Sequence, residues 1–277
     1  MIFRKRTIPD EEIMTLKEQR SMLGDQLNFA AAEAYKLLRA NLTFSLPDEQ
    51  KCRVVGVTSA VRGEGKSTTS INLAYTLAET GKRVLLVEAD MRRPQLAHRL
   101  AIDAAPGLSN LLAGLCREKD VVQDVGLLEN MKVITSGDVP PNPSELLGSE
   151  RMSTVVETLA QSFDFIIFDL PPVNAVSDGL VVSRFIQGMI VVVRQDYSDR
   201  QGLSAALRQL EYMHIKVLGF VMTHSSISGG RYGRYGRYGR YGRYGQYGRY
   251  ESESRETGAD QERARKTGSA KSRKSKR

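Results

Sequence analysis

Short apolar runs alternate with helix-length segments over most of the chain. Each run is apolar at odd and even positions alike, as expected for parallel strands that are covered on both faces. Segments with helical spacing, such as 66–81 and 198–213, separate the runs. The pattern predicts an α/β fold with a doubly wound, mostly parallel sheet, which binds ligands at the carboxyl ends of its strands. The predicted strands are 53–59, 83–89, 131–136, 163–170, 188–194 and 215–222.

Both ends of the chain depart from this pattern. Residues 10–46 are polar with apolar positions at helical spacing, and Pro47 ends that stretch. From Gly230 the sequence repeats Arg-Tyr-Gly, and the residues beyond the repeat include no apolar side chain larger than alanine. Such a composition cannot bury enough surface to fold, so disorder is expected there. We therefore predict an N-terminal helical segment (1–50), a nucleotide-binding domain (51–228) and a disordered tail (229–277).

Charge and composition exclude several classes of protein. The formal net charge of +8 arises in the tail, because residues 231–277 carry a net charge of +10 and the remainder carries −2. The body therefore does not have the charge of a nucleic-acid-binding domain. Two cysteines and three histidines form no metal-ligand or disulfide motif. Without a signal peptide or an apolar run of about 18 residues, we expect a soluble, cytoplasmic protein.

The first strand leads into a phosphate-binding motif. Residues 60–68 read AVRGEGKST, and Gly65-Lys66-Ser67 fits the end of the P-loop pattern, although Ala60 stands where its first glycine is usual. Backbone N–H groups and the following helix N-terminus would face phosphate oxygens. The sequence thus predicts a P-loop NTPase that binds ATP and Mg²⁺. The predicted ATP-binding residues are Gly63, Glu64, Gly65, Lys66, Ser67 and Thr68.

Carboxylates follow two further strands at the same edge of the sheet. Glu88 and Asp90 end the second predicted strand, and Asp169 ends the fourth, before Pro171-Pro172. Ser67, Asp90 and Asp169 are the predicted Mg²⁺ ligands. Simpler roles stay open: Asp169 as a turn residue, Asp90 as a salt-bridge partner of a neighbouring arginine, and Glu88 as a structural carboxylate.

These three motifs together resemble the bacterial tyrosine kinases of polysaccharide synthesis (BY-kinases). AVRGEGKST is similar to the family's Walker A motif, LLVEADMRRP to its second acidic motif and IIFDLPPV to its Walker B motif, and PPNPSELLGSERM (140–152) resembles a further family segment. The resemblance implies an ATP-dependent protein-tyrosine autokinase that regulates exopolysaccharide or capsule synthesis. Its catalytic residues would be Lys66, Asp90 or Glu88 as the base, and Asp169.

The resemblance also extends to the two ends of the chain. It implies autophosphorylation of a tyrosine cluster: Tyr232, Tyr235, Tyr238, Tyr241, Tyr244, Tyr247 and Tyr250. It further implies a ring-shaped oligomer through Glu33, Lys36 and Arg39, although residues at this spacing also form ordinary solvated salt bridges. A Gram-positive-type member would be a free cytoplasmic kinase, recruited and activated by a separate membrane protein, with other tyrosine proteins as further substrates.

Three positions depart from the family pattern. Glu88 replaces an aspartate, Thr223 stands where related proteins have an adenine-contacting asparagine, and Lys36 replaces an arginine. Two other functions remain open. A partition-type ATPase has the same fold, but its signature lysine is absent from Val61-Arg62-Gly63. An ATP-binding scaffold with an RNA-binding tail is the other alternative, because Arg–aromatic–Gly repeats bind single-stranded RNA.

Overall fold

A mostly parallel sheet forms the centre of the protein. The computed structural model describes residues 22–46 and 51–225. In these ranges seven strands pair in the order β3-β4-β2-β5-β1-β6-β7, and every pair is parallel except β3 with β4. This confirms the predicted fold class. The strands are β1 (Arg53–Ser59), β2 (Val84–Glu88), β3 (Gln123–Asp124), β4 (Met131–Ile134), β5 (Phe165–Asp169), β6 (Met189–Arg194) and β7 (Val217–Thr223).

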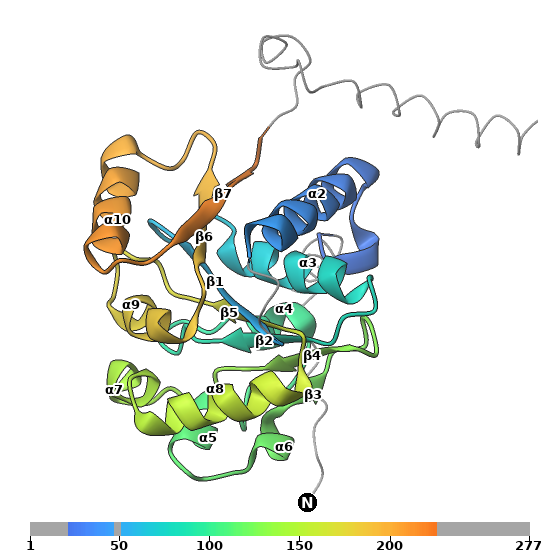
Figure 1. The fold of residues 1–277 in the computed structure, drawn as a ribbon, viewed down its shortest axis with the longest axis vertical. Helices are drawn as coiled ribbons and strands as arrows, with labels where there is room; N and C mark the ends of the chain where they lie inside the picture. The colour runs from blue at the N-terminus through green and yellow to red at the C-terminus, as the bar shows by residue number, and fades with distance from the viewer. Residues whose placement is uncertain (1–21, 47–50, 226–277) are drawn as a thin grey trace, which may run out of the picture. The chain divides into compact units, whose positions relative to one another are not determined.

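Helices cover both faces of this sheet (Figure 1). One face packs against α2 (Phe29–Ser45), α3 (Lys66–Ala78) and α4 (Leu96–Leu100). The opposite face packs against α5 (Leu108–Leu112), α6 (Glu118–Val121), α7 (Pro143–Leu147), α8 (Glu150–Ser162), α9 (Asp178–Val182) and α10 (Arg200–Tyr212). Two 3₁₀ turns, η1 (Gly24–Gln26) and η2 (Ser183–Phe185), complete the described elements.

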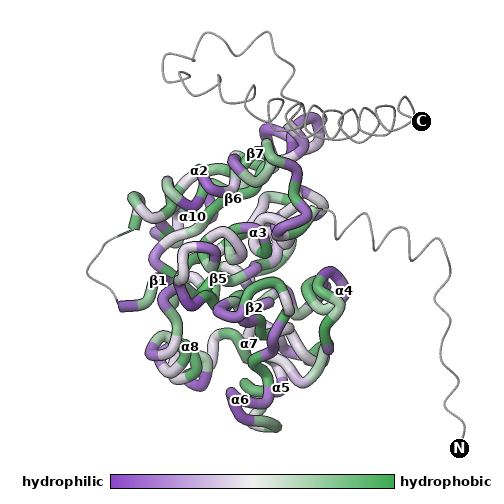
Figure 2. The backbone as a smooth tube through the Cα atoms, turned by 90° about the vertical axis from the view of Figure 1, so that its right-hand side faces the viewer, coloured by the Kyte–Doolittle hydropathy of each residue, from purple (hydrophilic) through white to green (hydrophobic). Residues whose placement is uncertain are grey.

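The apolar runs supply both cores because successive strand residues point to opposite faces. In β1, Val54 packs in the core beneath α8 and α10, whereas Val55 packs in the core beneath α3. Ile166 and Ile167 of β5 divide in the same way. In surface helices such as α2 and α8, hydrophobic and hydrophilic stretches alternate along the chain, as Figure 2 shows.

The N-terminal helix packs on the body of the protein. Asn28 caps α2 by accepting a hydrogen bond from the Ala31 N–H, at 2.9 Å. Arg39 of α2 donates to the Thr76 carbonyl oxygen of α3 at 2.6 Å and lies 3.9 Å from the Glu79 carboxylate. Asn72 of α3 holds η1 through hydrogen bonds to Gly24 and Met22. These contacts join α2 and η1 to α3.

The antiparallel strand β3 was not predicted, because two residues show no periodicity. The predicted tail lies outside the described residues, so the domain boundaries stay predictions. Among the described helices, none is both long and apolar enough to cross a lipid bilayer.

Candidate active site

The predicted phosphate-binding loop joins the end of β1 to the start of α3. Gly63 and Gly65 have positive φ angles of 77° and 95°, a region that favours glycine. A Cβ atom added at Gly65 would lie 3.2 Å from the Thr223 methyl group, so side-chain space is also limiting there. Both glycines are therefore required by the loop's shape, as expected for a loop that turns its backbone N–H groups inward.

Contacts from the ends of β6 and β7 hold this loop in place. The buried Glu64 carboxylate accepts hydrogen bonds from the Val61 N–H (2.8 Å) and from the Ser198 hydroxyl. Arg194 donates to the Gly63 carbonyl oxygen at 3.1 Å, and the Thr223 hydroxyl donates to the Glu64 carbonyl oxygen at 2.7 Å. The sequence did not reveal that Arg194, Ser198 and Thr223 support the loop, because each lies more than 130 positions from its partner.

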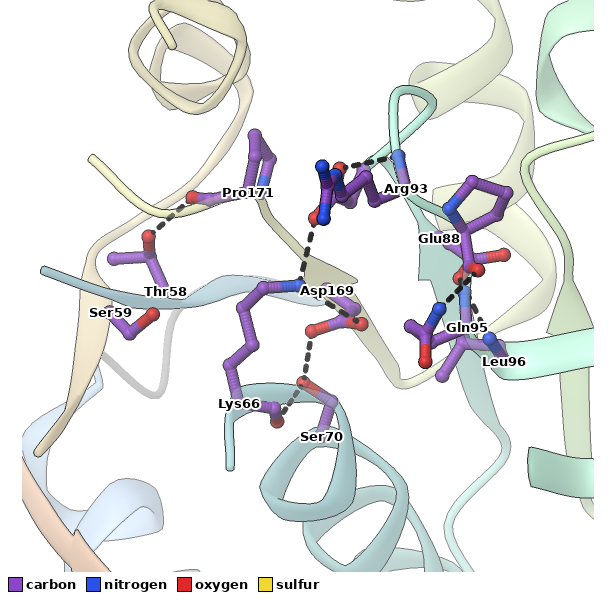
Figure 3. A network of polar contacts seen from close by, with 12 residues as sticks. Thr58, Ser59, Lys66, Ser70, Glu88, Arg93, Gln95, Leu96, Asp169 and Pro171 are labelled. Carbon is purple, nitrogen blue, oxygen red and sulfur yellow. Dashed lines mark hydrogen bonds and ion pairs between the residues drawn. The ribbon is translucent and has the colours of Figure 1, made fainter. Parts of the chain in front are cut away.

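Lys66 lies between the two predicted aspartates. Figure 3 shows its side chain beside Asp169. Its Nζ is 3.0 Å from Asp90 Oδ2 and 4.0 Å from Asp169 Oδ2. Burial lowers the pKa of the Lys66 ammonium, but the carboxylates of Asp169 and Asp90 outweigh that effect and raise it above its ordinary value. The lysine therefore stays charged in a largely buried position, where its electric field is weakly screened.

The residues around Asp169 fit a magnesium ion. Asp169 is fully buried; its Oδ1 accepts a hydrogen bond from Ser70 at 3.1 Å, whereas its Oδ2 has no hydrogen-bond partner among the described residues. Ser67 lies at the start of α3 with its side chain buried. The described residues contain no cluster of three or more His, Cys, Asp or Glu side chains arranged as a metal cage. Mg²⁺ commonly takes one or two protein carboxylates and completes its coordination with phosphate oxygens and water.

Glu88 directs its carboxylate away from Lys66, toward backbone donors. It is fully buried and accepts hydrogen bonds from the N–H groups of Gln95, Leu96 (2.7 Å) and Ser136 (3.1 Å). Burial raises the pKa of the Glu88 carboxyl, and the three backbone donors oppose that rise. In this arrangement Glu88 fixes the start of α4 and the end of β4. Asp90 is the carboxylate of the pair that reaches the lysine.

The loop that carries Asp90 is held by a second ion pair. Arg92 binds the buried Asp178 carboxylate at the start of α9 through two hydrogen bonds of 2.8 and 3.2 Å. Ser144 of α7, within the PPNPSELLG segment, donates to the same carboxylate. The Arg93 backbone N–H donates to Asp90 Oδ1 at 3.1 Å. Asp90 was expected to form a salt bridge with a neighbouring arginine. Arg93 instead gives Asp90 only its backbone N–H, and Arg92 pairs with Asp178.

Comparisons with known proteins show the family to which this chain belongs. A family described as "AAA domain" matches residues 52–218. The chain is 34% identical over 197 residues to the Tyrosine-protein kinase YwqD of Bacillus subtilis, which covers 71% of this chain and 82% of that protein. The chain belongs to the bacterial tyrosine-protein kinases.

Two solved structures resemble this kinase in fold and sequence. The chimerical protein CapA2B2 superposes with a TM-score of 0.69 at 31% identity, over 74% of this chain and 89% of that chain. The kinase domain of the Escherichia coli tyrosine kinase ETK gives 0.68 at 30% identity, over 81% and 85%. The recognised family is thereby confirmed.

The structure shows the contacts of Thr223 and Lys36, two residues at which this kinase departs from the family pattern. Thr223 contacts the phosphate-binding loop through its hydroxyl group, so it supports the loop from the end of β7. Its methyl group leaves no room for a side chain at Gly65. Lys36 and Glu33 form an exposed ion pair of 2.9 Å on α2. Arg39, the third predicted assembly residue, is instead engaged with α3. Assembly through this helix stays a prediction, and the seven tail tyrosines lie outside the described residues.

Proposed function

We propose that this kinase transfers the γ-phosphoryl group of ATP to tyrosines of its own C-terminal segment. The observation that carries the proposal is the position of Lys66 at the phosphate-binding loop, between the carboxylates of Asp90 and Asp169. The same chain carries seven acceptors at three-residue spacing. They are Tyr232, Tyr235, Tyr238, Tyr241, Tyr244, Tyr247 and Tyr250.

In the proposed reaction, a tyrosine phenolic oxygen forms a bond to the γ-phosphorus, the bond from that phosphorus to the bridging oxygen of ADP breaks, and ADP leaves. The transition state is loose, so positioning and charge neutralisation dominate the catalysis. The Lys66 ammonium would offset the negative charge on the γ-phosphoryl oxygens. Because its pKa is raised, it keeps that charge throughout the physiological pH range.

The acceptor tyrosine must lose a proton during the transfer. A phenol has an ordinary pKa near 10, so an accepting group beside it is needed at neutral pH. Asp90 would accept this proton, since it is the carboxylate that reaches Lys66. Glu88 is unsuited to this role because backbone N–H groups occupy its carboxylate.

Ser67, Asp90 and Asp169 would hold the magnesium ion that accompanies ATP. When bound, Mg²⁺ supplies additional neutralisation of phosphate charge. The Oδ2 atom of the buried Asp169 accepts no hydrogen bond from the described residues, which supports this assignment.

The biological setting follows from family membership. We propose that phosphorylation regulates exopolysaccharide or capsule synthesis, that the kinase assembles with copies of itself, and that a membrane adaptor recruits and activates it from the cytoplasm. Other tyrosine-containing proteins would be further substrates.

Phosphorylation of the full chain with ATP and Mg²⁺ tests the proposed acceptors. Mass spectrometry should find phosphotyrosine within 232–250 in the wild-type chain. A variant with all seven of these tyrosines changed to phenylalanine should incorporate little phosphate while binding ATP with unchanged affinity. Equal incorporation by both proteins would place the acceptors elsewhere.

A further inference from the structure

A further cation lies beside the phosphate-binding loop. Arg99 extends from α4, the helix whose start is fixed by Glu88, and its Nη1 donates a hydrogen bond of 3.2 Å to the Thr68 hydroxyl. Thr68 follows Ser67 in the first turn of α3. The guanidinium thus lies at the edge of the site where the backbone N–H groups of that turn would face phosphate oxygens.

The charge of Arg99 has no counter-charge within the described part of the chain. No carboxylate oxygen of the described residues lies within the 4.0 Å ion-pair distance, whereas Lys66 and Arg92 are each paired with a buried aspartate. Arg99 is partly buried, and its Nε is shielded from solvent without a hydrogen-bond partner among these residues. Leaving a charged donor buried and unsatisfied is unfavourable, so this guanidinium is suited to an anionic partner.

We infer that Arg99 binds the phosphate chain of the nucleotide from its position beside Thr68. This inference rests on the proposed function, because the ligand class is a nucleoside di- or triphosphate with Mg²⁺. Planar guanidinium groups match phosphate oxygens and form strong, charge-assisted hydrogen bonds. Thr68 contributes as well: its oxygen accepts from Arg99, so its own hydroxyl proton remains available to a phosphate oxygen.

Glu88 acquires a further role from this geometry. Its three backbone hydrogen bonds hold the start of α4 against the end of β4, and α4 in turn carries Arg99. The buried glutamate is therefore a positioning residue for the phosphate site, acting through α4 rather than on the reacting atoms.

The test measures ADP affinity by titration calorimetry with Mg²⁺ present, together with the thermal midpoint of the nucleotide-free protein. The variants are Arg99→Gln, Arg99→Lys and, as a matched control, Arg208→Gln on the exposed side of α10. Arg99→Gln should weaken ADP binding about ten-fold or more, the range of a charged hydrogen bond. Arg99→Lys should lose less, and Arg208→Gln should bind as the wild type does.

The thermal midpoints separate binding from a structural role. If Arg99 serves the nucleotide, Arg99→Gln leaves the nucleotide-free midpoint unchanged or higher, because an unsatisfied buried donor is removed. A lower midpoint with unchanged ADP affinity in Arg99→Gln and Arg99→Lys would overturn the inference alone. A wild-type protein that binds neither ADP nor ATP would overturn the proposed function and the inference together.

Discussion

Lys66 of the phosphate-binding loop and Asp90 of the loop after β2 form a partly buried ion pair, with 3.0 Å between Nζ and Oδ2. The pair joins two segments that are separated by 24 positions and places one positive and one negative group at the same point of the sheet edge. In the proposed reaction the two groups have opposite tasks, since the ammonium stabilises phosphoryl charge and the carboxylate accepts the phenol proton. ATP must therefore compete with Asp90 for the lysine.

The two acidic residues of the second motif should respond differently to neutralisation. Asp90→Asn should abolish most phosphotyrosine formation in a protein that stays folded, because Asp90 serves the chemistry. Glu88→Gln should lower the thermal midpoint, because an amide cannot accept all three backbone hydrogen bonds. Initial rates and melting curves of both variants provide the measurement. A larger rate loss in a fully stable Glu88→Gln protein would move the base to Glu88.

Removing the Asp169 carboxylate should raise the requirement for magnesium. Asp169→Asn keeps the shape of the side chain, but it removes the charge that would hold the ion. We expect the Mg²⁺ concentration for half-maximal activity to rise by about 10–100-fold, the usual effect of disturbing a metal site. Activity measured across a Mg²⁺ titration gives this value. An unchanged titration curve would show that the ion is held without Asp169.

The strand β1 and the phosphate-binding loop could be predicted from the sequence, because neighbouring residues determine both. The predicted strand 53–59 is β1 itself, and the glycines and Lys66 of the loop share one turn of chain. Long-range contacts were not predictable: nothing local indicates that Arg92 pairs with Asp178, or that Ser198 binds Glu64. The functions of Glu88 and Asp90 could not be separated either, since carboxylates two positions apart differ only in the partners that the fold brings to them.

Substitutions at Arg39 and at the Glu33–Lys36 pair of α2 should have different effects on stability and assembly. Arg39→Ala should destabilise the protein by about 1–2 kcal/mol, because it removes a charged hydrogen bond between α2 and α3. The double variant Glu33→Ala/Lys36→Ala should leave stability nearly unchanged, since exposed ion pairs contribute little. If these exposed side chains mediate assembly, only the double variant shifts to monomer without losing stability in sedimentation experiments. A wild-type protein that stays monomeric at all concentrations would refute assembly through α2.

Acid should weaken the ion pair between Arg83 and Asp164, the residues that directly precede the neighbouring strands β2 and β5. Hydrogen bonds from Arg83 hold the pKa of Asp164 below its ordinary value, and its carboxylate also accepts the Arg83 N–H at 2.8 Å. A lowered native-state pKa stabilises the fold above the unfolded-state pKa, and that stabilisation is lost as pH falls through the native value. Asp164→Asn should therefore be less stable than the wild type at pH 7, with the difference shrinking below about pH 4. Glu129→Gln, an exposed neutralisation, is the control, and a pH-independent difference would contradict the assignment.

Phosphotyrosine on the C-terminal segment, measured in the wild type and in Lys66→Met after incubation with ATP and Mg²⁺, tests the central claim most directly. The methionine side chain is similar in length but carries no charge, so folding is retained and can be verified by the melting curve. We predict phosphotyrosine within 232–250 of the wild type and none above background in Lys66→Met. Equal phosphotyrosine in a folded Lys66→Met protein would contradict the assignment of this site as the kinase centre.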